Sequence, residues 1–239
     1  MEKAVVLLSG GLDSTTCMAV AHSKGYELYP ISFDYHQRNS IELEGARQIA
    51  EYYHAKKHLI IETNMEQIGG SALTDQKIDV PDGNIEREEN DVPPTYVPAR
   101  NLIFLSYALG YAEVVGADHV YIGVNTVDYS GYPDCRPEFI EKFQEIANYS
   151  TKATVAEHKN IQIETPLQYL SKKEIIKLGI ELGVPFQFTH TCYKGGKKAC
   201  GICDSCQLRL RGFAEAGAVD PIEYEQRQGL VHEGCAKTE

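Results

Sequence analysis

A glycine-rich bend directly after the first apolar run of the chain constrains the fold more than any other feature. Residues 4–8 are short, apolar and rich in Val, as expected for a buried strand. Ser9-Gly10-Gly11-Leu12-Asp13-Ser14-Thr15 follows and leads into a predicted helix over 15–21. This order of strand, tight turn and helix places the turn at the sheet edge where phosphates bind in α/β proteins.

The same alternation continues along the chain. Strands are predicted over 28–33, 58–61 and 119–124, and helices over 40–53, 101–115, 138–150 and 171–182, with a last helix near 207–216. Asn39 and Ser171 are predicted N-caps, each with a Glu three residues later. Strands that alternate with helices predict a parallel sheet, so we expect an α/β fold with helices flanking that sheet.

The chemistry of the glycine bend points to an anion of the phosphate type. Two glycines allow close approach of the backbone, and Ser9, Ser14 and Thr15 add hydroxyl donors. The chain has no Walker A motif and no lysine in the bend, which disfavours transfer of a γ-phosphoryl group. Asp13 is a candidate Mg²⁺ ligand. The alternative is that the glycines only form a turn and that Asp13 or Ser14 only caps the helix.

Composition excludes several classes of partner. The 239 residues carry 23 Lys and Arg against 34 Asp and Glu, a formal charge of −11, which opposes binding to nucleic acid. The longest nearly apolar run, 102–115, is shorter than the roughly 20 residues that span a bilayer. The N-terminus has none of the features of an export signal. We expect a cytoplasmic protein that binds neither membranes nor nucleic acid.

Four of the seven cysteines lie close together near the C-terminus, in a C-x7-C-x2-C-x2-C pattern. Four thiolates at this spacing predict a structural Zn²⁺ site, and an iron-sulfur cluster is the rival. Nearby cations are expected to offset the charge of the site, and Cys17 and Cys135 are interpreted as packing residues. The predicted ligands are Cys192, Cys200, Cys203 and Cys206, and the cations are Lys194, Lys197, Lys198, Arg209 and Arg211.

The glycine bend resembles the pyrophosphate loop of the ATP pyrophosphatase (PP-loop) superfamily, whose members split ATP between the α and β phosphates and adenylate their substrates. Three further segments sharpen the resemblance: Ser32-Phe33-Asp34-Tyr35-His36-Gln37-Arg38, Thr95-Tyr96-Val97-Pro98-Ala99-Arg100-Asn101, and Asp128-Tyr129-Ser130-Gly131-Tyr132-Pro133-Asp134-Cys135-Arg136. Together with the cysteines, over about 4–211, they are similar to the 7-cyano-7-deazaguanine synthase family. His36 and Ala99 stand where glycine is expected in that family.

The resemblance implies a Rossmann-like fold of the adenine nucleotide α-hydrolase type and an ATP-dependent carbon-nitrogen ligase of queuosine biosynthesis. Such an enzyme converts 7-carboxy-7-deazaguanine and ammonia to 7-cyano-7-deazaguanine (preQ0), by adenylating first the carboxylate and then the amide. Structural Zn²⁺, Mg²⁺ and a homodimer are also implied. The implied ATP-binding residues are Leu8, Ser9, Gly10, Gly11, Leu12, Asp13, Ser14, Thr15, Thr16, Cys17 and Met18. The expected organisation is a PP-loop domain over 1–185 with an acidic insertion loop over 75–94, a zinc-binding helical lobe over 186–220, and a tail over 221–239.

Roles can be assigned to several polar residues of the three segments. The candidate catalytic residues are Asp13, Arg38, Arg100 and Asp128, and the two arginines are expected to clamp a phosphate or the substrate carboxylate. The candidate substrate-binding residues are Tyr132, Asp134 and Arg136. Surface salt bridges for the arginines, and a simple turn for 128–136, are the plainer alternatives.

Two other functions remain open at this level. A PP-loop enzyme that modifies tRNA, of the thiolation type, would need a basic surface, which the charge of −11 opposes. A nucleotide-binding regulator would have no use for a loop that holds departing pyrophosphate.

Overall fold

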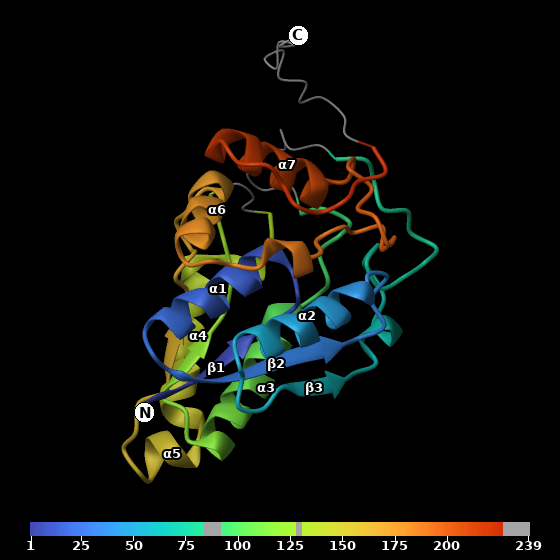
Figure 1. The fold of residues 1–239 in the computed structure, drawn as a ribbon. Coiled ribbons are helices and arrows are strands. Elements are labelled where there is room, and N and C mark those ends of the chain that lie inside the picture. The colour runs from blue at the N-terminus through green and yellow to red at the C-terminus, as the bar shows by residue number, and fades with distance from the viewer. Residues whose placement is uncertain (84–91, 128–130, 227–239) are drawn as a thin grey trace.

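The computed structural model describes residues 1–83, 92–127 and 131–226, which form a parallel sheet covered by helices on both faces (Figure 1). The strands are β1 Lys3–Leu7, β2 Glu27–Asp34, β3 Leu59–Glu62, β4 His119–Tyr121 and β5 Gln162–Glu164. The helices are α1 Leu12–Ser23, α2 Ile41–Tyr52, α3 Arg100–Val115, α4 Pro137–Ser150, α5 Lys152–Val155, α6 Lys172–Glu181 and α7 Asp204–Ala216. Short 3-10 turns occur at Met65–Gln67, Pro133–Cys135 and Phe186–Phe188.

The five strands have the order β3-β2-β1-β4-β5, and all neighbouring pairs are parallel. The chain builds outward from β1 to β3 and then returns to add β4 on the other side of β1. In open α/β sheets, ligands bind outside the carboxyl ends of the strands at the point where the order reverses. Here that point lies between β1 and β4. The predicted parallel sheet is therefore confirmed.

Both faces of β1 are buried, which explains why its sequence is uniformly apolar rather than alternating. Ala4 and Val6 pack with residues of α1, α2 and α6 on one face of the sheet. Val5 and Leu7 pack with residues of α3 and α4 on the other face (Figure 1). The four cysteines of the C-terminal pattern belong to the core on this second face, so the cysteine-rich segment and the sheet share one buried cluster.

Several predicted boundaries are wrong by a few residues. Helix α1 begins at Leu12 rather than Thr15, because Gly11 is its N-cap. Strand β4 ends at Tyr121 rather than Val124, and the residues that follow enter the cavity described below. The N-cap of α2 is Ser40 rather than Asn39. The short strand β5 was not predicted at all.

The capping box that opens α6 is confirmed. The Ser171 hydroxyl accepts from the Glu174 amide, and the Glu174 carboxylate accepts from the Ser171 amide at 2.8 Å. Within the described residues, no helix is both long enough and apolar enough to cross a membrane. The proposed boundary between the lobes at 185/186 stays a prediction, and residues 84–91 of the predicted acidic loop lie outside the described chain.

Candidate active site

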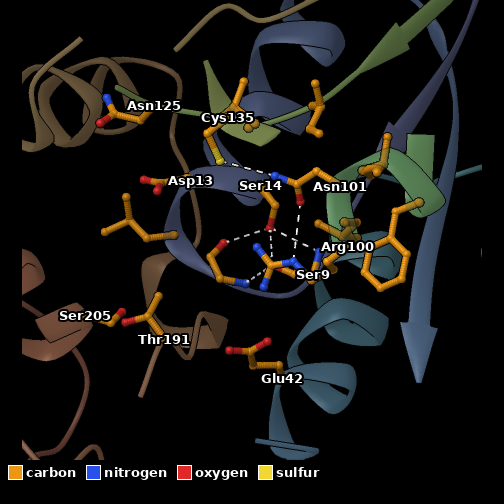
Figure 2. A pocket seen from close by; sticks show the side chains of 18 of the residues that line it. Ser9, Asp13, Ser14, Glu42, Arg100, Asn101, Asn125, Cys135, Thr191 and Ser205 are labelled. Carbon is orange, nitrogen blue, oxygen red and sulfur yellow. Dashed lines mark hydrogen bonds between the residues drawn. The ribbon is translucent and has the colours of Figure 1, made fainter. Parts of the chain in front are cut away.

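A cavity of about 280 Å³ opens at the carboxyl ends of β1, β2 and β4, at the reversal point of the sheet. Its walls combine the glycine bend, the start of α2, the start of α3 and the segment after β4 (Figure 2). Apolar side chains cover part of it, including Phe33, which stacks on Phe104 with ring centroids 3.8 Å apart. Its polar lining residues include Ser9, Asp13, Ser14, Glu42, Arg100, Asn101, Asn125, Lys172, Thr191 and Arg209.

The glycine bend has the conformation and packing of an anion-binding turn. Gly10 has φ +89°, and an added Cβ would lie 2.1 Å from the carbonyl oxygen of Glu42, so the first turn of α2 rests directly on the bend. The Thr15 amide makes the first hydrogen bond within α1, to the oxygen of Gly11. The amides of Leu12, Asp13 and Ser14 therefore have no acceptor within the helix, and the positive end of the helix dipole lies at the cavity.

The hydroxyls of Ser9 and Ser14 stabilise the bend by hydrogen bonds to its own backbone amides. Ser14 Oγ accepts from the Ser9 amide at 3.2 Å and lies 3.0 Å from Ser9 Oγ, which in turn accepts from the Gly11 amide at 3.2 Å. Both serines line the cavity, whereas Thr15 Oγ1 bonds back to the Gly11 oxygen at 2.7 Å. Thr15, Thr16, Cys17 and Met18, predicted as part of the ATP site, are buried in α1 and are not among the cavity residues.

Lysine reaches the bend from a distant part of the chain. Lys172, the first residue of α6, lies 2.7 Å from both carboxylate oxygens of Asp13 and lines the cavity. The bend itself contains no lysine, and Lys172 is not among the predicted site residues. The capping box at Ser171 fixes where α6 begins, but nothing local in the sequence indicates that its first turn faces residue 13.

The N-cap of helix α3, Ala99, has a left-handed backbone at φ +55°. His36, at the end of β2, has φ +57°. These are the two positions at which the resemblance predicted glycine, and the left-handed backbone is the physical reason for that expectation, because a Cβ in this region costs about 1–2 kcal/mol. The chain keeps the backbone conformation without glycine, and it places Arg100 at the cavity.

The start of α3 is held by the segment 131–136. Asp134 is buried and accepts from the Asn101 amide at 2.8 Å, while Asn101 Nδ2 donates to the Asp134 carbonyl at 3.1 Å. Cys135 lies 3.2 Å from the same Nδ2, and burial raises the pKa of its thiol to about 12, which suits a packing residue. Tyr132 lines the cavity, and its hydroxyl lies 2.9 Å from Thr95 Oγ1.

The other predicted site residues lie elsewhere or outside the described chain. Arg38 is not among the cavity residues, and its Nη2 donates to the carbonyls of Asp75 and Ile78, so it fixes the start of the acidic loop. Arg136 is the N-cap of α4 and also does not line the cavity. Asp128 lies outside the described residues. The substrate roles of Asp128, Asp134, Arg38 and Arg136 stay predictions.

The four cysteines converge as their spacing predicted. All four are buried, and their Sγ atoms lie within 4.8 Å of one another. A tetrahedral ion with metal-sulfur bonds of roughly 2.3 Å places its sulfurs roughly 3.8 Å apart, and the Cys200 and Cys206 Sγ atoms are 3.9 Å apart. The Cys200 amide also donates to Cys192 Sγ at 3.3 Å. This donor set fits a single metal ion.

The neighbouring cations have partners other than the cysteines. Arg209 pairs with Asp220, Lys194 with Asp82, Lys198 with Glu223 and Arg211 with Glu215. That these cations also offset the thiolate charge stays a prediction. Arg209 is also a cavity residue, which the sequence did not indicate.

Comparison with known proteins agrees with this geometry. The family model described as "Queuosine biosynthesis protein QueC" matches residues 3–217. The "7-cyano-7-deazaguanine synthase" of Desulfitobacterium hafniense is 61% identical over 224 residues, 94% of each chain. That of Acetivibrio thermocellus is 61% identical over 227 residues, covering 95% of this chain and all of that protein.

A solved structure supports the fold. The NMN synthetase from Francisella tularensis superposes with a TM-score of 0.50 at 18% identity, covering 91% of this chain and 78% of that one, a likeness that concerns the fold alone. The family model spans the glycine bend, the three segments that suggested the resemblance, and all four cysteines. The chain belongs to the family of the queuosine biosynthesis protein QueC.

Proposed function

We propose that this protein is an ATP-dependent carbon-nitrogen ligase that makes 7-cyano-7-deazaguanine from 7-carboxy-7-deazaguanine and ammonia. The observation that carries the proposal is the 61% identity to proteins of that name over 94% of the chain, and the family model spans the whole cavity. The tRNA-thiolation alternative is not favoured, because the family match and these relatives point to the deazapurine reaction.

The reaction needs activation and positioning more than unusual chemistry. A carboxylate is a poor electrophile, so one of its oxygens attacks the α-phosphorus of ATP, pyrophosphate leaves, and a mixed anhydride with AMP forms. Ammonia then displaces AMP to give the amide. A second ATP adenylates the amide oxygen, and loss of AMP and a proton gives the nitrile. Each adenylation releases one pyrophosphate, whose charge grows in the transition state.

The residues at the bend suit that task. Backbone amides at the start of α1 and the hydroxyls of Ser9 and Ser14 present fixed dipoles to the departing pyrophosphate. Lys172 adds a positive charge, and Arg100 adds a guanidinium that can pair with a phosphate or with the substrate carboxylate. Asp13 would hold Mg²⁺, which when bound shares the phosphate charge.

We also propose that the four cysteines hold Zn²⁺ in a structural role. The sulfur positions fit one ion, whereas an iron-sulfur cluster interposes several irons and sulfides between its thiolates. We expect elemental analysis of the purified protein to give about one zinc per chain, with no visible absorption band. A brown protein with iron in place of zinc would contradict this assignment.

The remaining expectations belong to the same proposal. We propose a homodimer in the cytoplasm whose substrates are small molecules, with no role for nucleic acid or membranes. Tyr132 is the substrate-binding candidate best supported by position, since it lines the cavity between Thr95 and Tyr193. Arg38 and Asp128 are proposed as further catalytic residues, and Asp134 and Arg136 as further substrate-binding residues.

One assay tests the function. The protein is incubated with 7-carboxy-7-deazaguanine, ammonium, Mg²⁺ and ATP, and the products are analysed by mass spectrometry and nucleotide chromatography. We expect the nitrile, with AMP and pyrophosphate formed in equal amounts and an amide that appears transiently. Release of ADP instead of AMP, or absence of nitrile, would contradict the proposal. The Asp13→Asn variant is the negative control.

A further inference from the structure

Glu42 is a carboxylate in the active cavity to which the reaction described above gives no role. It is the second residue of α2, and its side chain lines the cavity, as does that of Thr191 (Figure 2). Its own carbonyl oxygen is the atom that rests on Gly10. The side chain is therefore fixed next to the bend that receives the phosphates.

The carboxylate of Glu42 is only partly satisfied by the protein. Asn39 Nδ2 donates to its Oε1 at 2.5 Å, and within the described residues no ion pair joins it to a lysine or arginine. The positive charge of Arg100, on α3, lowers the pKa of Glu42 electrostatically, without an ion pair between the two side chains in the described part of the chain. Nearby, the Oγ1 of Thr191 is buried without a hydrogen-bond partner among the described atoms. The Glu42 carboxylate and the unpartnered Thr191 hydroxyl thus line the same cavity.

A second carboxylate close to a phosphate-binding bend is unfavourable unless a cation or a proton compensates its charge. Burial is the main cause that raises the pKa of Glu42 to about 8, against the opposing effects of the Asn39 amide and the Arg100 charge. Tyr35, after β2, and the Cys192 thiol also interact with Glu42 electrostatically, the thiol less than Arg100. The charged side chains of Asp13, Lys172 and Arg209 line the same cavity. A carboxyl in this position exchanges a proton near neutral pH.

We propose that Glu42 binds the ammonium cosubstrate and acts as the base that releases ammonia beside the adenylated intermediate. This inference rests on the proposed function. Ammonium gives one proton to a Glu42 oxygen and becomes ammonia, whose lone pair attacks the acyl carbon. The C–N bond forms as the C–O bond to AMP breaks, and the extra proton on nitrogen leaves with AMP or solvent. The neutral Glu42 carboxyl then returns its proton to solvent.

Two other occupants would fit a carboxylate less well. Mg²⁺ is proposed above to bind Asp13, the carboxylate of the bend itself. If Glu42 instead bound the amide edge of the deazaguanine, the heterocycle would occupy the space at the bend that is proposed to hold the phosphates. Both occupants remain outcomes of the experiment below.

Hydroxylamine separates binding of the adenylate from activation of the nucleophile. It is largely unprotonated at neutral pH and captures an acyl adenylate as a hydroxamate without help from a base, whereas ammonia is present almost entirely as ammonium. The test compares wild type, Glu42→Gln and Glu44→Gln, with hydroxylamine and with ammonium, across a range of pH. Glu44 is the matched control, because it lies on the same helical turn with its side chain 64% exposed.

We expect the Glu42→Gln variant to form hydroxamate within about threefold of the wild-type rate. With ammonium at neutral pH, its rate of amide formation should fall by about 100-fold or more, the usual effect of losing a general base. That deficit should shrink as the pH rises toward the pKa of ammonium, because free ammonia then becomes abundant. Glu44→Gln should match wild type throughout.

The other outcomes each overturn the proposal. Loss of hydroxamate together with amide would place Glu42 in adenylation, for example as a Mg²⁺ ligand. A raised KM for the deazapurine acid with an unchanged pH profile would make it a reader of the heterocycle. A Glu42→Gln variant as active as wild type with ammonium would give the residue no chemical role. If wild type itself forms neither hydroxamate nor AMP, the proposed function fails instead.

Discussion

Replacement of Gly10 by Ala is expected to abolish turnover and to lower the free energy of unfolding by roughly 2–5 kcal/mol. Two costs combine at this position. A Cβ at φ +89° costs about 1–2 kcal/mol, and that Cβ would lie 2.1 Å from the Glu42 carbonyl, an overlap that moves the first turn of α2. Because the same turn carries Glu42 and packs on the bend, the anion site is distorted together with the fold.

Gly25 provides the matched control for this variant. It also has a left-handed backbone, at φ +77°, but an added Cβ would meet nothing within 4 Å. Gly25→Ala should therefore lose only the conformational cost, about 1–2 kcal/mol, and keep full activity. Urea unfolding and the nitrile assay on both variants measure the difference. Equal stability loss and equal activity in the two would show that the contact between the bend and α2 is unimportant.

Local patterns in the sequence were enough to predict the sheet and the bend. The apolar run at 4–8 is buried on both faces, and the glycines that follow lead into the N-terminus of α1 beside the cavity. The cysteine spacing likewise placed four sulfurs around one point. In each of these cases the residues that determine the local geometry lie within about fifteen positions of one another. A local sequence pattern was therefore enough to predict that geometry.

The parts of the site that were missed depend on contacts between distant segments. Lys172 reaches Asp13 across 159 residues, and Arg209 enters the cavity from α7. Which face of a helix meets the bend depends on the packing of α6 on α1 and α7, and no motif encodes that packing. The guanidinium of Arg38 donates to the carbonyls of Asp75 and Ile78, a long-range contact that its motif did not indicate, and its predicted role as a phosphate clamp stays a prediction.

The second large effect on stability is expected from removal of the buried ion pair between Arg209 and Asp220. Arg209 Nε donates to Asp220 Oδ2 at 2.7 Å, Nη2 donates to Oδ1 at 2.8 Å, and both side chains are only 2% exposed. Thr189 Oγ1 and the Tyr224 hydroxyl complete the network. Asp220→Asn leaves a buried guanidinium without its counterion, so we expect a loss of about 3–5 kcal/mol in the free energy of unfolding.

The same substitution should also reduce activity, because Arg209 links the C-terminal segment to the cavity wall and to the 186–189 turn. The exposed pair of Arg211 and Glu215, on the same helix, is the control. Glu215→Gln should change stability by less than about 1 kcal/mol, since surface pairs contribute little. Urea unfolding of the metal-loaded protein measures both variants. If Asp220→Asn were as mild as Glu215→Gln, the packing of α7 on α6 would depend on the metal and the apolar core alone.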